Sequence, residues 1–311
     1  IMKYYEAIQF EVGPEHDGWR LDTVLRQGYG LSRRLLVRLK KTEKGIMVNG
    51  ERAWTNRIIK TGDRIELYME MESSEQVIPE PLPLNILYED EYLLVLDKRA
   101  GIIVHPTHGH YRGTIANGVV HYWKSRGESY RFRLVHRLDE WTSGVLVVAK
   151  NHYADQQISK QILAGTMERE YTAVVHGHPP QASGVIDAPI ARNPVQPALR
   201  IVSNQGAEAK TWFETVDDYG IASKLRLRLV TGRTHQIRVH MLHVGCPLIG
   251  DPLYTTPEWK KREEKMPIKR QALHASRIAF LHPVSKAPVS FTSPLPADIV
   301  GLIESICKMP E

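Results

Sequence analysis

Two kinds of hydrophobic periodicity predict the regular structure of the first 70 residues. Apolar residues within 35–39 follow the period of 3.6 residues that is typical of a helix packed on one side, and Ser32 precedes them as an N-cap. Alternating apolar and polar residues follow in 45–50, which ends in an Asn-Gly turn, and again in 64–68. We therefore expect helices followed by a small hairpin.

Residues 71–84 separate this unit from the rest of the chain. They contain three prolines and few periodic apolar residues, which is typical of an extended linker. We expect an N-terminal domain at 13–70 and a second domain at 85–300.

The second domain contains strands and helices in an interspersed order. The apolar patterns predict strands at 92–96, 102–105, 144–149, 171–175 and 225–229, and helices at 151–165 and 235–244. In the last strand, leucines alternate with Arg226 and Arg228, which predicts one packed face and one basic face.

The positive charge of the chain is concentrated in its N-terminal part. Over 311 residues, 41 Lys and Arg against 35 Asp and Glu give a net charge of +6, whereas residues 20–64 alone contain twelve basic and four acidic residues. The remainder is close to neutral. A basic module attached to a near-neutral body is one interpretation, and an ordinary solvated surface is the other.

Other features of the composition favour a cytoplasmic protein. No apolar run is long enough to span a membrane, and no secretory signal is recognisable. Cys246 and Cys307 stand far apart without metal-ligand spacing, so neither a disulfide framework nor a Cys-type zinc site is expected.

A polar loop at 136–144 carries the most informative chemistry. It leads directly into an apolar run and places Asp139 at the entrance of a strand. From the residues alone two interpretations are open, because Asp139 next to Arg137 suits a structural ion pair as well as a catalytic carboxylate.

Four short motifs of the N-terminal domain are similar to the S4 RNA-binding module, in the order and spacing of that module. They are Arg20-Leu21-Asp22, Ser32-Arg33, Val48-Asn49-Gly50 and Gly62-Asp63. The resemblance implies an RNA-binding surface, and the residues that we expect to contact RNA are Arg20, Arg33, Arg34, Arg38 and Lys40.

The second domain resembles the RluA-type family of RNA pseudouridine synthases over roughly residues 85–295. The family signature of His-Arg-Leu-Asp, two residues, Thr-Ser-Gly, an apolar run and Ala-Lys stands unbroken from His136 to Lys150. Further matching segments are 101–106, 171–177, 231–240, 250–254 and 273–275. Arg169 departs from the pattern, since the family more often has Lys there; the charge is kept.

This resemblance implies an α+β fold. It implies a catalytic domain with a mixed, mainly antiparallel sheet and helices packed around a central cleft, together with a small N-terminal S4-like α/β module. The expected partner is structured RNA, with large-subunit ribosomal RNA as the leading substrate, and the expected state is a monomer.

The resemblance also implies an isomerase that needs no cofactor, metal or redox step. The glycosidic bond of a uridine breaks, the uracil turns, and it is rejoined through C5. Asp139 is implied as the ionised carboxylate beside C1′ and C6, either as nucleophile or as stabiliser of developing positive charge.

Three further roles are carried over from the family. Arg238 is implied as the cation paired with Asp139. Tyr171 is implied to stack on the uracil, and its hydroxyl is also a candidate to take the C5 proton. Arg137 is implied to enter the space that the flipped uridine vacates. Without the resemblance, simpler interpretations are open. Arg238 would be a surface arginine, and Tyr171 would pack in the core. Arg137 would be a structural partner of Asp139.

Two other functions compete with this one. His235, His240 and His243 suggest a metal hydrolase, but offsets of five and eight do not share one face of a helix. A non-catalytic RNA-binding protein built on a degenerate synthase fold is the second alternative, and the presence of Asp139 argues against it.

Overall fold

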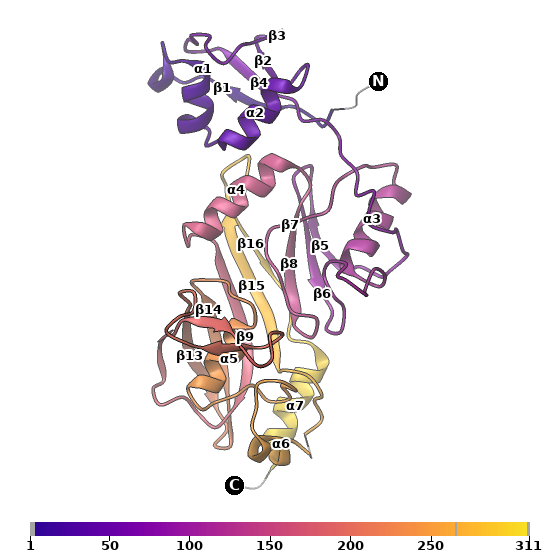
Figure 1. The fold of residues 1–311 in the computed structure, drawn as a ribbon, viewed down its shortest axis with the longest axis vertical. Helices are drawn as coiled ribbons and strands as arrows, with labels where there is room; N and C mark the ends of the chain where they lie inside the picture. Colours follow the sequence, from indigo (N-terminus) through magenta and orange to yellow (C-terminus); the bar gives the residue numbers. More distant parts are fainter. Residues whose placement is uncertain (1–3, 265, 310–311) are drawn as a thin grey trace.

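The computed structural model describes residues 4–264 and 266–309, which form a small N-terminal unit and a larger C-terminal unit (Figure 1). Residues 71–84, which connect the two, contain neither helix nor strand. Within the described part of the chain, every helix is too short or too polar to cross a membrane.

The N-terminal unit is an antiparallel sheet in the order β1-β4-β2-β3 with short helices packed on it. Its elements are β1 (Ile8–Glu11), α1 (Leu21–Thr23), α2 (Arg33–Lys41), β2 (Ile46–Val48), β3 (Glu51–Arg52) and β4 (Arg64–Leu67). The Ser32 hydroxyl accepts the Leu35 N–H and caps α2, as predicted. Asn49 and Gly50 both have positive φ, which is typical of the turn between two short strands.

The larger unit is built on one ten-stranded sheet. Eight strands follow the order β10-β13-β14-β9-β15-β8-β6-β5, while β16 pairs with β15 and β7 pairs with β8. Their bounds are β5 (Ile86–Glu89), β6 (Leu93–Lys98), β7 (Arg133–Leu134), β8 (Ser143–Ala149), β9 (Glu168–His176), β10 (Ser183–Asp187), β13 (Lys210–Asp218), β14 (Ala222–Leu229), β15 (Leu273–Leu281) and β16 (Pro288–Thr292). All pairs in this sheet are antiparallel except β15 with β8, so the expected mainly antiparallel sheet is confirmed.

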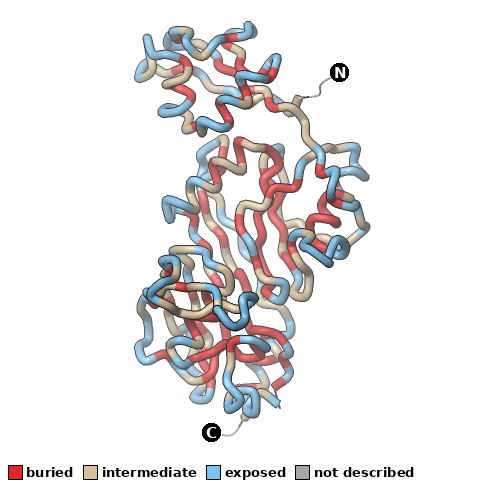
Figure 2. Tube along the Cα trace, in the orientation of Figure 1, coloured by how far each residue is buried: buried red, intermediate tan, exposed pale blue. Residues whose placement is uncertain are grey.

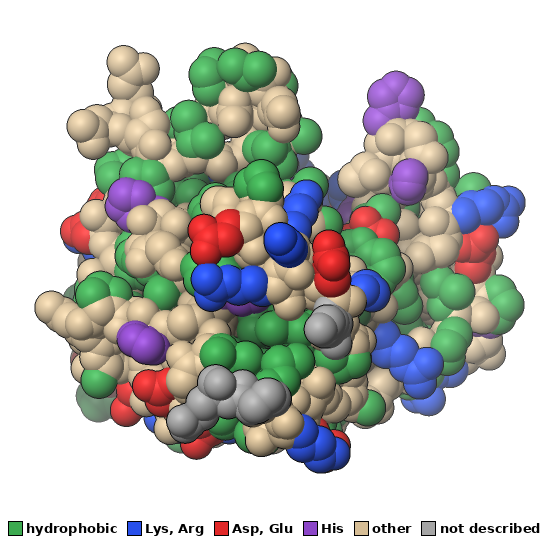
Figure 3. Space-filling model, turned by 90° about the horizontal axis from the view of Figure 1, so that it is seen from below, with side chains coloured by type: hydrophobic (Ala, Val, Ile, Leu, Met, Phe, Trp, Pro, Cys, Tyr) green, Lys and Arg blue, Asp and Glu red, His purple; other side chains and the backbone are tan. Residues whose placement is uncertain are grey.

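In the described part of the larger unit, five helices and a small hairpin surround this sheet. They are α3 (Ile115–Ser125), α4 (His152–Leu163), α5 (Gln236–His243), α6 (Pro257–Glu263), α7 (Ala297–Cys307) and the pair β11 (Ile190–Arg192) and β12 (Arg200–Val202). Figure 2 shows the buried residues concentrated along the central strands, whereas the loops at the ends are exposed. At the end that carries α6 and α7, acidic and basic side chains are interspersed (Figure 3).

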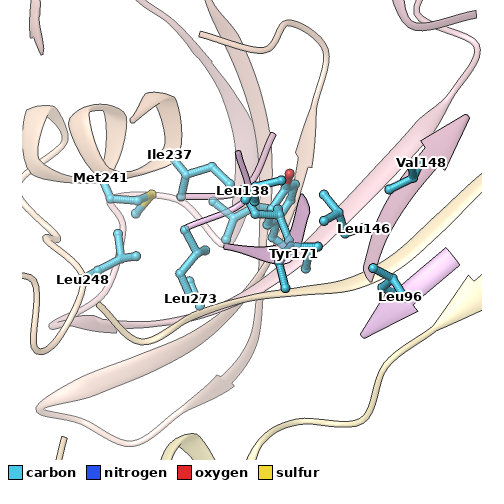
Figure 4. Packing of buried hydrophobic residues seen from close by; sticks show 14 of the residues in the cluster. Leu96, Leu138, Leu146, Val148, Tyr171, Ile237, Met241, Leu248 and Leu273 are labelled. Atoms are coloured by element: carbon cyan, nitrogen blue, oxygen red, sulfur yellow. The ribbon is translucent and has the colours of Figure 1, made fainter. Parts of the chain in front are cut away.

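Strand β8 is buried along its whole length because it has a hydrophobic cluster on each face. Leu146 and Val148 belong to the cluster that includes Tyr171, shown in Figure 4, and Val145 and Val147 belong to the cluster under α4. The second residue of the strand is Gly144, whose φ is 113°. A Cβ there would lie 2.2 Å from the Ala275 carbonyl oxygen, so only glycine permits the close pairing of β8 with β15.

The strand predicted at 102–105 was wrong, although the other four predicted strands overlap β6, β8, β9 and β14. The carbonyl groups of Ile103 and Val104 accept the N–H groups of Ile115 and Ala116 in the first turn of α3. The segment therefore uses its backbone to satisfy a helix terminus rather than to join the sheet.

Candidate active site

One buried arginine joins three segments at the centre of the larger unit. Arg238, on α5, donates from Nε and Nη2 to the two carboxylate oxygens of Asp251, at 2.6 and 2.7 Å. Its Nη1 donates to Oδ2 of Asp139 at 3.2 Å. The Arg238 side chain is 5% exposed and that of Asp251 is 0% exposed, whereas that of Asp139 is 23% exposed. Asp139 is therefore the carboxylate of this chain of ion pairs that reaches solvent.

The surroundings of Arg238 keep it charged. Burial disfavours the charged form, but the hydrogen bonds and the charge of Asp251 outweigh that cost and raise the pKa of the guanidinium above its ordinary value. The guanidinium also lies 4.8 Å from the ring centroid of Tyr254, a cation–π contact.

The loop that carries Asp139 is held by its backbone. The Thr142 N–H donates to the Asp139 carbonyl, which closes a turn. Buried Lys98 donates to the Glu140 carbonyl at 2.8 Å, and buried Arg270 donates to the Trp141 carbonyl at 3.0 Å. Because these two side chains bind main-chain oxygens, they leave the Asp139 carboxylate to pair with Arg238 and face the cleft.

Tyr171 lies on β9 beside this loop. Figure 4 shows it next to Leu138 within the hydrophobic cluster. Burial is the main reason that its pKa is raised to about 12. The phenol is therefore protonated near neutral pH.

Three cavities meet at Asp139, and one of them, of about 470 Å³, extends from Tyr171 past Arg169. The other two share more of the candidate site residues. A small one of about 60 Å³ lies among Tyr171, Leu229 and Ile237, and a larger one of about 630 Å³ extends past Trp141 and Leu253. Asp139, Arg137, His235 and Arg238 line both. The larger volume lies within the range of ligand-binding clefts.

The three histidines of the metal hypothesis do not converge. The Nε2 of His235 lies 3.9 Å from Asp139 Oδ2, its Nδ1 lies 2.7 Å from the Tyr254 hydroxyl, and burial lowers its pKa. Both ring nitrogens of His240 are hydrogen-bonded within the core, to Thr211 and Ala188, and His243 is exposed. In the described ranges 4–264 and 266–309, no group of three or more His, Cys, Asp or Glu residues is arranged to hold a metal ion.

Arg137 is exposed at the rim of all three cavities. Among the described residues, the ionic partners of Asp139 are Arg238 and His235, so the ion pair of Asp139 with Arg137 that the sequence left open is not formed.

The arginines and lysine expected to contact RNA in the N-terminal unit have different surroundings. Arg33, Arg34 and Lys40 are exposed on α2. Arg38 is half-buried and pairs with Glu72 of the connecting segment, while Arg20 pairs with Asp22. These five residues lie in a different unit from Asp139.

Sequence reasoning missed three residues that position the site. Asp251 stands in a segment that was matched to the family without a role, so its carboxylate was a signal that we did not use. Lys98 follows an apolar strand, and Arg270 lies in no matched segment. Only their burial in the folded protein distinguishes them from surface cations.

The known proteins to which this chain is similar are named as RNA pseudouridine synthases. Residues 92–243 match the family described as RNA pseudouridylate synthase. The chain is 40% identical over 276 residues to the uncharacterized RNA pseudouridine synthase YjbO of Bacillus subtilis, covering 88% of this chain and 95% of that protein. It is 35% identical over 307 residues to ribosomal large subunit pseudouridine synthase D of Nitrosomonas europaea, covering 98% of this chain and 89% of that protein.

A solved structure shares the fold. The human RNA pseudouridylate synthase domain containing 4 aligns with a TM-score of 0.58 at 22% identity, over 73% of this chain and 95% of that one.

The buried ion pair predicts a large stability difference. Asp251→Ala leaves buried Arg238 with Asp139 as its remaining carboxylate partner, so we expect the free energy of unfolding to fall by about 3–5 kcal/mol in urea titrations. Glu258→Ala, which removes an exposed partner of Arg262, is the matched control and should cost less than about 1 kcal/mol. Equal losses in the two variants would contradict this account of Arg238.

A second prediction concerns acid stability. His136 is buried, its Nε2 accepts the Val147 N–H, and burial followed by the charge of Arg169 lowers its pKa from 6.5 to about 3. Only the unfolded chain binds a proton between these values, so His136 contributes stability that is fully present above pH 6.5 and is lost toward pH 3, at about 1.4 kcal/mol per pH unit.

The measurement is the free energy of unfolding of the wild type and His136→Gln at several pH values from 4 to 7. The wild type should show the steeper dependence, by about 1.4 kcal/mol per unit. Parallel curves would mean that His136 titrates normally in the folded protein.

Proposed function

Because this chain belongs to the RluA-type family of RNA pseudouridine synthases, which are isomerases that convert uridine to pseudouridine in RNA, we propose that Asp139 is its catalytic carboxylate and large-subunit ribosomal RNA its substrate. The observation that carries the assignment is the arrangement of Arg238, buried and bound to Asp251, with Asp139 at the cleft. The name of the Nitrosomonas europaea relative supports the choice of RNA.

Asp139 acts on the uridine after the base has left the stack. Unstacking costs a few kcal/mol, and Arg137 at the rim occupies the vacated space. The carboxylate adds to the sugar or the base, or stabilises the positive charge that develops when the C1′–N1 bond breaks. Arg238 orients Asp139 and compensates its charge.

Tyr171 holds the uracil and relays a proton. The reaction as a whole breaks C1′–N1, forms C1′–C5 and moves one proton from C5 to N1. A phenol is both donor and acceptor, so the Tyr171 hydroxyl can accept the C5 proton while it passes its own proton on. The pKa of about 12 supports a neutral phenol in this role rather than a tyrosinate.

The N-terminal unit is an S4-like RNA-binding domain in this proposal, and the larger unit is the catalytic domain. The predicted extents of 13–70 and 85–300, with a linker at 71–84, leave out β1 at 8–11 and the end of α7 at 301–307, which belong to these units. The exposed side chains of Arg33, Arg34 and Lys40 on α2 support contacts to phosphate. One chain supplies Asp139, Arg238 and Asp251, which supports action as a monomer.

Asp139→Asn tests the assignment, because it removes the charge with little change in shape. In cells that lack the protein, pseudouridine mapping of total RNA should show a large-subunit ribosomal site that the wild type restores and Asp139→Asn does not. With purified protein we expect the rate to fall by at least about 10³-fold. If Asp139→Asn restores the pseudouridine as well as the wild type does, Asp139 is not the catalyst. If the pseudouridine that depends on this protein lies in another RNA, large-subunit ribosomal RNA is not the substrate.

Tyr171→Phe separates the two roles of the tyrosine. It keeps the ring, so RNA affinity should stay within a few-fold, while turnover of uridine should fall by about 10²–10⁴-fold because proton transfer is lost. RNA containing 5-fluorouridine at the target has no C5 proton to remove, so formation of its C1′–C5-linked product should be slowed far less. If both substrates are slowed equally, the hydroxyl does not transfer the proton.

A further inference from the structure

A basic pocket lies at the junction of the N-terminal unit and the larger unit, apart from the Asp139 site. It has a volume of about 490 Å³. Three elements supply its charged side chains: α2, the segment around β7, and α4. These side chains are Arg34, Arg38, Arg131, Arg133, His152 and Asp155.

Two of these arginines form ion pairs within the protein, and two do not. Arg38 and Arg133 both pair with Glu72, which compensates part of their charge. Arg34 and Arg131 are exposed, and within residues 4–264 and 266–309 neither side chain has a hydrogen-bond or ion-pair partner. The acidic groups at the pocket are Asp155 and Glu72, so four guanidinium groups leave a net positive charge.

The positive charge at the pocket affects the protonation of His152. Its Nε2 lies 2.5 Å from Nη1 of Arg38, which can only donate, so His152 is the acceptor. Burial, and then the charges of Arg133 and Arg38, lower the pKa of His152 to about 4. The ring is therefore neutral at pH 7 and adds no charge of its own to the pocket.

The junction pocket continues toward the catalytic cleft. Leu134, on β7, lines both the pocket and the larger cavity at Asp139. Arg131 and Asp139 are eight residue steps apart, so their Cα atoms lie at most about 26–29 Å from each other. A strand of RNA that places its uridine at Asp139 therefore passes within reach of the pocket.

The pocket is preformed by contacts between the two units. Gln156, on α4, accepts the Ser32 N–H at 3.0 Å and donates to the Gly30 carbonyl at 2.6 Å. These contacts bring α2, which carries Arg34, and the segment around β7, which includes Arg131, to the same concavity. Planar guanidinium groups bind phosphate oxygens in a bidentate manner.

We propose that the junction pocket binds phosphate groups of the RNA strand that flanks the target uridine, through Arg34 and Arg131. This inference rests on the proposed function, and it goes beyond the exposed face of α2 because seven of the eleven residues that line the pocket belong to the larger unit. One RNA strand then contacts both units at the junction pocket. The N-terminal unit binds the same strand on which the larger unit acts.

The test measures RNA affinity against salt concentration for Arg34→Ala/Arg131→Ala. The probe is a ribosomal RNA fragment in which the wild type is first shown to form pseudouridine. Loss of two phosphate contacts should reduce the slope of log affinity against log salt by about 1.4–1.8. Lys260→Ala/Lys261→Ala removes the same charge from exposed positions on α6, at the opposite end of the molecule, and should leave the slope unchanged (Figure 1).

Two further measurements exclude other causes. Urea unfolding of the double variant should match the wild type, because neither arginine holds the fold. Arg34→Lys/Arg131→Lys should keep the slope, since the charges are kept. A slope for the alanine variant equal to that of the α6 control would overturn the phosphate site, whereas failure of the wild type to form pseudouridine would overturn the proposed function instead.

Discussion

The geometry of the site depends on the burial of one charged group, Arg238. A guanidinium removed from water must be compensated by carboxylates in good geometry, or it destabilises the fold by several kcal/mol. Asp251 satisfies two of its nitrogens from a fully buried position, which sets the plane of the guanidinium. The third nitrogen then points at Asp139. The buried pair of Arg238 and Asp251 therefore sets the position of the partly exposed Asp139 carboxylate.

A second constraint acts on the backbone around Asp139. Lys98 and Arg270 bind carbonyl groups of the loop, and Gly144 lets the following strand approach β15 closely. The loop is thereby attached to the rigid sheet while its acidic side chain remains available. Sites supported in this way hold reacting groups within the narrow tolerance that catalysis requires.

In the proposed function, the two units divide the work of acting on RNA between binding and chemistry. Residues 20–64 carry twelve basic and four acidic residues, and the remainder of the chain is close to neutral. Contacts to phosphate supply affinity without reading sequence, and part of that free energy offsets the cost of unstacking a base. The catalytic cleft, lined by both apolar and polar residues, supplies the chemistry. A concavity shared by both units lets one strand meet both functions.

The sequence by itself determined the local elements and the identity of the loop. The cap at Ser32, the Asn49-Gly50 turn and strand β8 follow from periodicity and turn chemistry, which depend on neighbours in the chain. The family signature pointed to Asp139. The strand predicted for 102–105 was wrong. Its apolar pattern is typical of a strand, but two of its carbonyl groups accept N–H groups from the first turn of α3. The tertiary structure alone decided which charges meet: Arg238 and Asp139 are 99 residues apart, and Lys98 and Glu140 are 42 apart. Ion pairing depends on distance and burial in the folded chain, and no local pattern encodes either.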